Sequence, residues 1–236
     1  MMTELTLPII GYMHSSYKEK FGIPRQPNLV QVESYIEMLA PYNDVLAFEG
    51  IEAFSHLWLL WQFHDNKNPE KTQFRPQVRP PRLGGNKKIG VFATRSMYRP
   101  SQIGLSVVKL KCVKKEGKSV RVYVTGSDLL DGTPIVDIKP YIHYSDAVID
   151  AESGYAQDEP KRKSVIWSDR ASEQKQQLLM REKLSLQTVQ ELEAVLSLDP
   201  RPAYQDDEAR VYKMKFAAVD IAFTVGETTV NITAVE

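Results

Sequence analysis

Short apolar and β-branched runs separated by turn residues dominate the first ~145 residues, and they constrain the fold more than any other feature of the sequence. About eight such runs can be distinguished, and no long helical pattern alternates with them. This arrangement disfavours a doubly wound nucleotide-binding sheet. Because closure removes exposed strand edges, the pattern predicts a closed or strongly curled β-barrel. The expected strands include Asp44–Phe48, Ser55–His64, Ile89–Thr94, Ile103–Leu110, Ser119–Thr125 and Pro134–Lys139.

The last third of the chain has a different pattern. Helical periodicity extends over Ser168–Arg181 and Leu186–Leu196, and Ser185 is a suitable N-cap for the second helix. Val211–Val225 and Thr228–Val235 then predict a closing β-hairpin. The predicted fold is therefore mainly β. We expect a β-barrel domain at residues 1–150, a linker at 151–165, and a small α+β domain at 166–236.

Composition and processing signals limit the compartment. A single cysteine, Cys112, among 236 residues excludes an intrachain disulfide. No apolar run approaches the length of a membrane span, and residues 1–6 lack the basic start of a signal peptide. The sequence predicts a cytoplasmic protein that makes no contact with a membrane.

The formal net charge of zero conceals a strong charge asymmetry. The stretch from Lys71 to Lys115 contains twelve Lys or Arg residues and no Asp or Glu, whereas Asp128–Glu159 contains eight acids and one base. A block of one sign is typical of a surface that binds a polyanion such as RNA. Alternatively, the fold scatters these charges, or the acidic block covers the basic one.

The most basic motif within this block is Arg95-Ser96-Met97-Tyr98-Arg99-Pro100, which lies between two predicted strands. Pro100 lacks an N–H and restricts Arg99, so neither strand continues through the motif. It therefore presents two guanidiniums, two hydroxyls and an aromatic ring at the end of a β support. This set suits a planar, anionic ligand that carries a base. The alternative is an exposed β-hairpin with solvated arginines.

Three further polar segments are candidate ligand contacts. Pro24 and Pro27 stiffen a loop that carries Arg25 and Gln26, although such loops are common. A second candidate is the pair His64-Asp65 at a strand end, and a third is the turn Asp128–Asp131, which ordinary Asx-turn chemistry also explains. His56 and His64 have no third ligand at a spacing typical of a metal site, so no metal site is expected.

Four separated motifs resemble the TrmO family, whose members are also called TsaA-like or YaeB-like. They are IGYMHSSYKEKFGIPRQPN, FSHLWLLWQFHD, RPPRLGGNKKIGVFATRSMYRPSQIGLS and GSDLLDGTPIVDIKPYIHYSDA, which together cover about Leu7–Asp146. DPRPAY at Asp199–Tyr204 is similar to a motif of the C-terminal domain of bacterial members. Met97-Tyr98 and Ser101 depart from the common family pattern, but both arginines of the motif are retained.

The resemblance implies a small single-sheeted β-barrel that binds S-adenosylmethionine and methylates tRNA. The acceptor in the family is the N(6) nitrogen of threonylcarbamoyladenosine next to the anticodon. The family also implies a homodimer in which each cofactor site draws on both chains. Its cofactor contacts correspond here to Pro24, Arg25, Gln26, His64, Asp65, Arg95, Leu105, Asp128, Leu129, Leu130 and Asp131.

The chemistry of methyl transfer adds further candidates. A group that removes the proton of the acceptor nitrogen should help the attack, and Asp137, His64 and Tyr141 are alternatives for this role, as is proton loss to water. Two other functions stay open: a non-catalytic tRNA-binding module and an S-adenosylmethionine-binding sensor. The residues expected to contact the anticodon stem-loop are Arg75, Arg79, Arg82, Lys87, Tyr98, Arg99 and Lys139.

Overall fold

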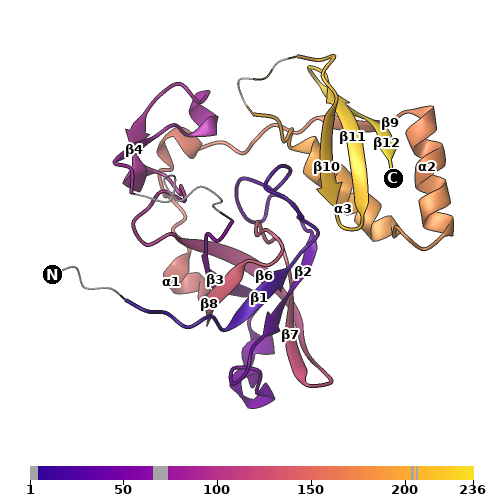
Figure 1. The fold of residues 1–236 in the computed structure, drawn as a ribbon. Helices are drawn as coiled ribbons and strands as arrows, with labels where there is room; N and C mark the ends of the chain where they lie inside the picture. Colours follow the sequence, from indigo (N-terminus) through magenta and orange to yellow (C-terminus); the bar gives the residue numbers. More distant parts are fainter. Residues whose placement is uncertain (1–4, 66–73, 203–204, 206) are drawn as a thin grey trace.

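The first half of the chain is a closed six-stranded antiparallel β-barrel, as the sequence predicts (Figure 1). We describe a computed structural model, which places residues 5–65, 74–202, 205 and 207–236. The strands follow one another around the barrel in the order β1-β2-β7-β6-β3-β8, and β8 pairs with β1 to close it. Their bounds are β1 Gly11–His14, β2 Glu33–Met38, β3 His56–Gln62, β6 Ile103–Glu116, β7 Ser119–Thr125 and β8 Pro134–Pro140.

Strand alternation explains the barrel core. In β3, Leu57, Leu59 and Trp61 point inward and are buried, while the residues between them are partly exposed. The valines of β7 follow the same period, and each is fully buried. Full burial of one such aliphatic side chain contributes about 1.5–3 kcal/mol, so the two strands strongly favour this register.

Two of the predicted strands are wrong. Asp44–Phe48 contains the 3-10 helix η1, Val45–Phe48, because the Asp44 carboxylate accepts a hydrogen bond from the Leu46 N–H at 3.0 Å and caps the turn. Ile89–Thr94 divides into the short strand β5, Ile89–Gly90, and the 3-10 helix η5, Val91–Ala93. Strand β5 pairs with β4, Gln77–Val78, and not with β6, so the basic motif is not the tip of a β-hairpin.

Short helical turns occupy the remaining connections. The 3-10 helix η2, Ile51–Ala53, follows Gly50. The connector that precedes the basic motif carries η4, Pro81–Leu83, and β8 leads directly into α1, His143–Asp146. A last turn, η6, spans Gly154–Ala156 and contacts η4.

The C-terminal part consists of a four-stranded sheet in the order β10-β11-β12-β9 and two helices (Figure 1). Both helices are confirmed, together with the N-cap at Ser185, whose hydroxyl accepts a hydrogen bond from the Thr188 N–H at 3.0 Å. Strand β9 pairs in parallel with β12 and begins within the stretch suggested as a linker. The bounds are β9 Ser164–Trp167, α2 Asp169–Met180, α3 Leu186–Ser197, β10 Tyr212–Phe216, β11 Val219–Val225 and β12 Thr229–Val235.

The predicted closing hairpin has one strand more than expected. Val211–Val225 was expected to form one arm, but the chain reverses at Ala217, where φ is +51°, and yields the two strands β10 and β11. The Ala217 N–H donates a hydrogen bond of 2.8 Å to the Ser16 carbonyl, and this bond stabilises the reversal from another part of the chain. A contact between residues so far apart in the sequence cannot be predicted from the local sequence pattern.

The segment between β1 and β2 joins the two parts of the molecule. Tyr17, Val30 and Val32 lie in the hydrophobic core of the C-terminal sheet, although they flank the loop that carries Arg25. Tyr17 also forms an isolated bridge with Phe216 and contacts its ring at 6.0 Å. The loop at residues 18–28 is therefore held between the barrel and the C-terminal sheet.

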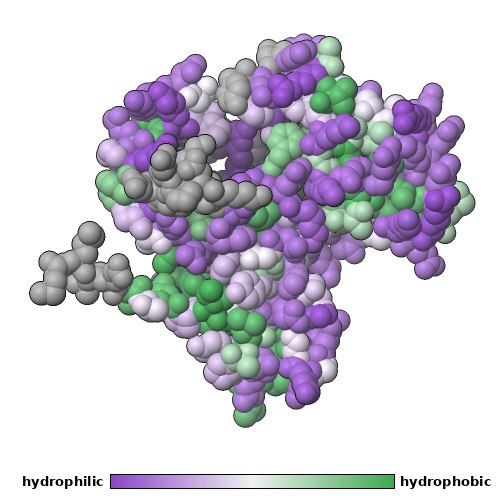
Figure 2. All heavy atoms as spheres, viewed as in Figure 1, coloured by the Kyte–Doolittle hydropathy of each residue, from purple (hydrophilic) through white to green (hydrophobic). Residues whose placement is uncertain are grey.

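The surface is largely hydrophilic over the C-terminal part, whereas apolar side chains gather over the barrel beside the N-terminal segment (Figure 2). Leu5 and Leu7 of that segment are exposed. Among the described residues, no helix combines the length and the apolar composition needed to cross a membrane.

Candidate active site

Asn28 anchors the loop that carries Arg25 and Gln26 to the barrel. Its N–H donates to the Gly126 carbonyl at 2.8 Å, and its side-chain amide donates to the Val107 carbonyl at 2.9 Å. The residue adopts a left-handed conformation with φ of +64°, which asparagine tolerates better than most residues. Because Gly126 lies two residues before the turn Asp128–Asp131, this anchor joins two segments that the sequence nominated independently.

The basic motif reaches the same loop. The Arg95 guanidinium donates to the Gln26 side-chain oxygen at 2.5 Å. Pro24 is buried and fixes the start of the loop, while Arg25 is exposed and donates to the Arg201 carbonyl at 3.2 Å. The structure thus brings together Gln26 and Arg95, which are 69 residues apart in the chain.

A buried hydrogen-bonded chain leads from the barrel core to Asp128. The Trp61 indole N–H donates to the Ser106 hydroxyl at 3.0 Å, and this hydroxyl donates to the Asp128 carboxylate at 2.6 Å. Gly104 makes room for the indole, since a Cβ atom there would lie 2.3 Å from the Trp61 ring. Ser106 and Trp61 therefore hold the Asp128 carboxylate in one orientation at the end of the barrel.

Burial raises the pKa of the Asp128 carboxyl to about 6. The Ser106 hydrogen bond and the positive charge of Arg95 act in the opposite direction and limit the rise. The charge of Arg95 thus acts on Asp128 although no direct bond joins them. A carboxylate, a guanidinium and an amide consequently share one region at this end of the barrel.

The other residues of the turn have structural roles. Leu129 is 1% exposed and belongs to the barrel core, and its carbonyl accepts a hydrogen bond from the Ser15 hydroxyl at 2.9 Å. The Leu130 carbonyl accepts the Thr133 hydroxyl at 2.7 Å. Asp131 forms an ion pair with Lys18 at 2.9 Å and accepts the Ser15 N–H at 2.9 Å. These bonds shape the turn that presents Asp128.

Leu105 lies on the opposite side of β6 from the Asp128 network. It is 50% exposed, whereas its neighbour Ser106 is 1% exposed and points inward. On the outer face, Leu60 of β3 pairs with Leu105 of β6 and with Asp137 of β8, so these three residues form one row across the strands. Asp137 forms an ion pair with Lys139 at 2.8 Å.

His64 and Asp65 follow β3 at the end where Trp61 lies. Asp65 forms an ion pair with Lys20 at 3.6 Å, which links it to the β1–β2 loop. Partial burial lowers the pKa of the His64 imidazole, although the Asp65 charge opposes this effect. His64 is therefore largely neutral at pH 7 and has a free nitrogen lone pair that can accept a proton.

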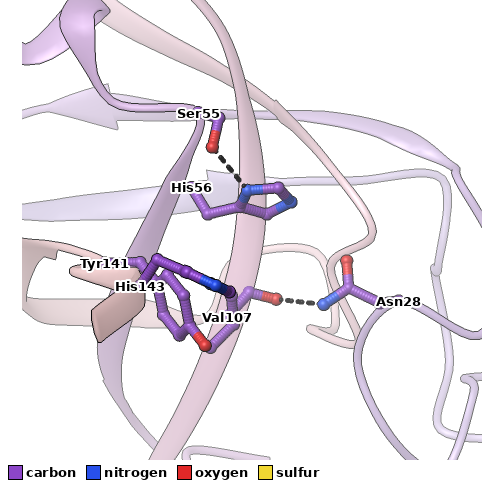
Figure 3. A pocket seen from close by; sticks show the side chains of 6 residues that line it. All are labelled: Asn28, Ser55, His56, Val107, Tyr141 and His143. Atoms are coloured by element: carbon purple, nitrogen blue, oxygen red, sulfur yellow. Dashed lines mark hydrogen bonds between the residues drawn. The ribbon is translucent and has the colours of Figure 1, made fainter. Parts of the chain in front are cut away.

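Tyr141 lies at the His56 end of β3. It lines a pocket of about 560 Å³ with Asn28, His56 and His143, in which His56 is hydrogen-bonded to the Ser55 hydroxyl at 2.9 Å (Figure 3). The Tyr141 N–H pairs with the His56 carbonyl, at the start of β3. Trp61 lies five residues further along β3, which corresponds to about 16 Å. Tyr141 therefore lies at the other end of β3 from Trp61, and Asn28 links its pocket to the loop that carries Arg25.

The residues nominated for RNA contact lie in different environments. Arg79, Arg82 and Lys87 are exposed. The Arg75 guanidinium stacks over the Tyr98 ring at 4.5 Å, which covers part of that ring. Arg99 donates to the Thr94 carbonyl at 2.8 Å and so supports the basic motif from within. Lys139 lies apart from this group, on β8.

No group of three His, Cys, Asp or Glu side chains suited to a metal ion occurs in the part of the chain that the structure describes. The charged groups of this region are carboxylates, guanidiniums and the ammonium groups of Lys18 and Lys20. Such a set suits an organic ligand that carries both a carboxylate and an ammonium group.

Comparison with known proteins identifies the family. Residues 12–147 match the family model of the tRNA-methyltransferase O N-terminal domain, and residues 160–236 match that of the TrmO C-terminal domain. The chain belongs to the TrmO family. The resemblance inferred from the four motifs is thereby confirmed.

Relatives of the TrmO family match over most of the chain. The tRNA (adenine(37)-N6)-methyltransferase of Escherichia coli (strain K12) is 45% identical over 208 residues, which are 88% of this chain and 86% of that protein. A crystal structure of TrmO from Pseudomonas aeruginosa has a TM-score of 0.79 at 34% identity and covers 100% of this chain and 99% of its own. The mouse tRNA (adenine(37)-N6)-methyltransferase is 43% identical over 141 residues, 58% of this chain and 31% of that protein.

Sequence reasoning missed the TrmO-family residues that position the charged groups. Ser106 and Gly104 interrupt an apolar strand at inward positions, and this was the available signal, because a small polar residue there requires a buried partner. Trp61 and Asn28 both lie within motifs quoted for the family, but neither was nominated for the site. The partners of Asn28 are distant in sequence, so its role could not be predicted from its neighbours.

Proposed function

We propose that this TrmO-family enzyme transfers a methyl group from S-adenosylmethionine to the N(6) nitrogen of adenosine 37 of tRNA, with threonylcarbamoyladenosine as the acceptor. The observation that carries the proposal is the assembly of Gln26, Arg95 and Asp128 at one end of the barrel. The names of the Escherichia coli and mouse relatives support the position and the nitrogen. The threonylcarbamoyl group follows from the family resemblance alone.

The residues fit S-adenosylmethionine, which supplies an electrophilic methyl group on a sulfonium when it is bound. A guanidinium of Arg25 or Arg95 suits its carboxylate through a paired hydrogen bond. The half-buried Asp128 carboxylate suits its ammonium group or its ribose hydroxyls. The Ser106 hydroxyl fixes the Asp128 carboxylate, so the site is ordered before any ligand enters.

Alignment is the main contribution that these residues make to methyl transfer. Holding donor and acceptor in line can lower the barrier by up to ~7–11 kcal/mol. His64, Asp137 and Tyr141 stay alternatives for removing the proton on the acceptor nitrogen. His64 follows β3 at its Trp61 end and is largely neutral, while Asp137 lies on the outer face in one row with Leu60 and Leu105, so it fits a site that a second subunit completes.

Two features support a homodimer in which both chains complete each site. Leu105 and Ser106 are adjacent in β6 and therefore point to opposite faces of the sheet. If Asp128 and Leu105 contact the same ligand, one of them is contributed by the second subunit. The outer face around Leu105 also exposes apolar surface, since Leu105 is 50% exposed.

The exposed cations of the connector support tRNA as the substrate. Arg79, Arg82 and Lys87 have no acidic neighbour in sequence between Lys71 and Lys115. Each such cation at a phosphate releases counterions, which makes RNA binding sensitive to salt. A cytoplasmic location agrees with this substrate.

Transfer of a labelled methyl group to defined tRNA tests the proposal. Purified protein should label tRNA that carries threonylcarbamoyladenosine at position 37, and label neither unmodified tRNA nor tRNA already methylated there. Equal labelling of modified and unmodified tRNA would disprove the threonylcarbamoyl requirement. Salt-sensitive tRNA binding without transfer, unaffected by Arg25→Ala and Asp128→Ala, would favour the non-catalytic binding module. Cofactor binding without RNA affinity would favour the sensor.

A further inference from the structure

Phe92 is an exposed aromatic residue on a well-supported turn. It is the central residue of η5, Val91–Ala93, and its side chain is 69% exposed. The preceding Val91 is 1% exposed and anchors the turn, and its N–H donates to the Pro76 carbonyl at 3.0 Å. The Thr94 hydroxyl donates to the Val91 carbonyl at 2.7 Å and closes the turn. The exposure of Phe92 is therefore built into the fold.

Arg99 braces this turn and contacts the Phe92 ring. Its guanidinium donates to the Thr94 carbonyl at 2.8 Å and to the Val91 carbonyl at 3.5 Å. The same guanidinium lies 5.5 Å from the centre of the Phe92 ring. Phe74 lies on a different segment, and its ring is 6.2 Å from that of Phe92 with an interplanar angle of 32°. Arg99 thus orients an aromatic surface instead of pointing freely into solvent.

The surroundings of Phe92 favour an anionic partner. Arg79, Arg82, Lys87 and Lys88 are exposed, and within the described part of the chain none of them forms an ion pair. The acidic segment that follows α1 approaches the turn, because the Tyr155 hydroxyl donates to the Ala93 carbonyl at 3.3 Å. The turn η6 of that segment contacts η4, which carries Arg82, but within the described residues the segment forms no ion pair with the four cations. Phe92 and these cations belong to the same stretch of chain, residues 79–92.

We propose that Phe92, supported by Arg99, is a stacking platform for an unpaired nucleobase of the RNA substrate. Aromatic rings among phosphate-binding cations are the usual means by which proteins hold single-stranded RNA. Phe92 precedes Arg95 by three residues, so the two backbones lie within about 11 Å of each other. The base is therefore a loop neighbour of the acceptor nucleotide. This inference rests on the proposed function and assigns the base contact to Phe92, whereas the sequence favoured Tyr98.

RNA binding measured without methyl transfer tests this platform. The probe is a synthetic anticodon stem-loop RNA with 2-aminopurine in place of a loop purine beside adenosine 37, titrated with the full-length protein. Wild-type protein should quench the 2-aminopurine fluorescence through stacking. Phe92→Ala should weaken binding by about 5- to 150-fold and abolish the quench, as expected for loss of one stacked base. Phe92→Trp should retain both.

Leu46→Ala is the matched control. Leu46 is 75% exposed and also lies on a 3-10 turn, η1, but that turn itself contains no Lys or Arg. This variant should bind the RNA as the wild type does. Arg82→Ala should lower the dependence of log K on log salt by about one, whereas Phe92→Ala should leave that slope unchanged, because a stacked ring releases no counterions.

Four results would overturn the platform. Two concern affinity: Phe92→Ala binds the loop RNA within twofold of wild type, or it loses as much affinity for a fully paired RNA hairpin as for the loop RNA. The third is that the wild type does not bind the RNA. The fourth is that Phe92→Ala changes from dimer to monomer, which would identify Phe92 as a subunit contact. Failure of the proposed function is distinguishable. RNA binding that depends on Phe92 without any methyl transfer would retain the platform and reject the activity.

Discussion

Removal of the Asp128 carboxylate should make the stability of this protein less dependent on pH. Burial raises the pKa of Asp128 from 3.8 to about 6 in the folded chain, against the opposing effects of Ser106 and Arg95. Between these two values the unfolded chain has released a proton that the folded chain retains. Unfolding therefore releases a proton in this range, and rising pH favours unfolding.

The pKa difference sets the size of the effect. Each pKa unit corresponds to ~1.4 kcal/mol, so ionisation of Asp128 costs the folded state about 3 kcal/mol once the pH exceeds 7. Asp128→Asn keeps the size of the side chain and a hydrogen-bond acceptor for Ser106, and it cannot ionise. Relative to wild type, its free energy of unfolding should rise by about 3 kcal/mol between pH 4 and pH 7 and then stay constant.

Urea unfolding followed by tryptophan fluorescence at a series of pH values measures this difference. Comparison of the two proteins at each pH cancels the titration of all other groups. Asp150→Asn is a matched control for loss of an exposed aspartate carboxyl. A difference between Asp128→Asn and wild type that is constant from pH 4 to pH 8, or that falls with pH, would refute the buried-carboxylate reasoning. The same variant should lose cofactor affinity above pH 6, where the wild-type carboxylate is ionised, and this loss should shrink as the pH falls through 6.

Three further outcomes are expected. Gly104→Ala places a methyl group against the Trp61 indole, so it should cost about 1–3 kcal/mol of stability and weaken cofactor binding. Gly90→Ala is the control, because open space surrounds that position, and it should be close to neutral in thermal unfolding. Arg95→Ala should reduce cofactor affinity in calorimetry with little change in melting temperature, since the residue is exposed; an equal loss of both would make it structural. Burial opposes the shift, but hydrogen bonds and charge from Arg201 lower the pKa of Asp199. Asp199→Asn should therefore destabilise the C-terminal part at neutral pH. The difference from wild type should shrink below pH 4, where the wild-type carboxylate becomes protonated, and circular dichroism melts measure it.

Much of the fold was readable because it depends on local periodicity. The alternation in β3 and β7 and the capping serine before α3 are properties of neighbouring residues, and each predicted the correct element. The barrel followed from the number of strands and the absence of helices between them. The family motifs then nominated Arg25, Arg95 and Asp128.

The errors occurred where local hydrogen bonds or distant contacts outweighed the apolar pattern. Asp44 caps η1 and Thr94 closes η5, so two runs that are apolar enough for strands became 3-10 turns. Ala217 reverses the chain between β10 and β11 with help from the Ser16 carbonyl, which is 201 residues away in the sequence.

The sequence by itself determined the type of most elements, the family and the residue types available for catalysis. Only the tertiary structure decided how they are used: Trp61 and Ser106 orient Asp128, Arg99 braces Phe92, and Tyr141 lies at the far end of β3. The physical reason is that a hydrogen bond or a buried charge depends on which distant segments meet. Periodicity within one segment fixes the direction of a side chain but not its partner.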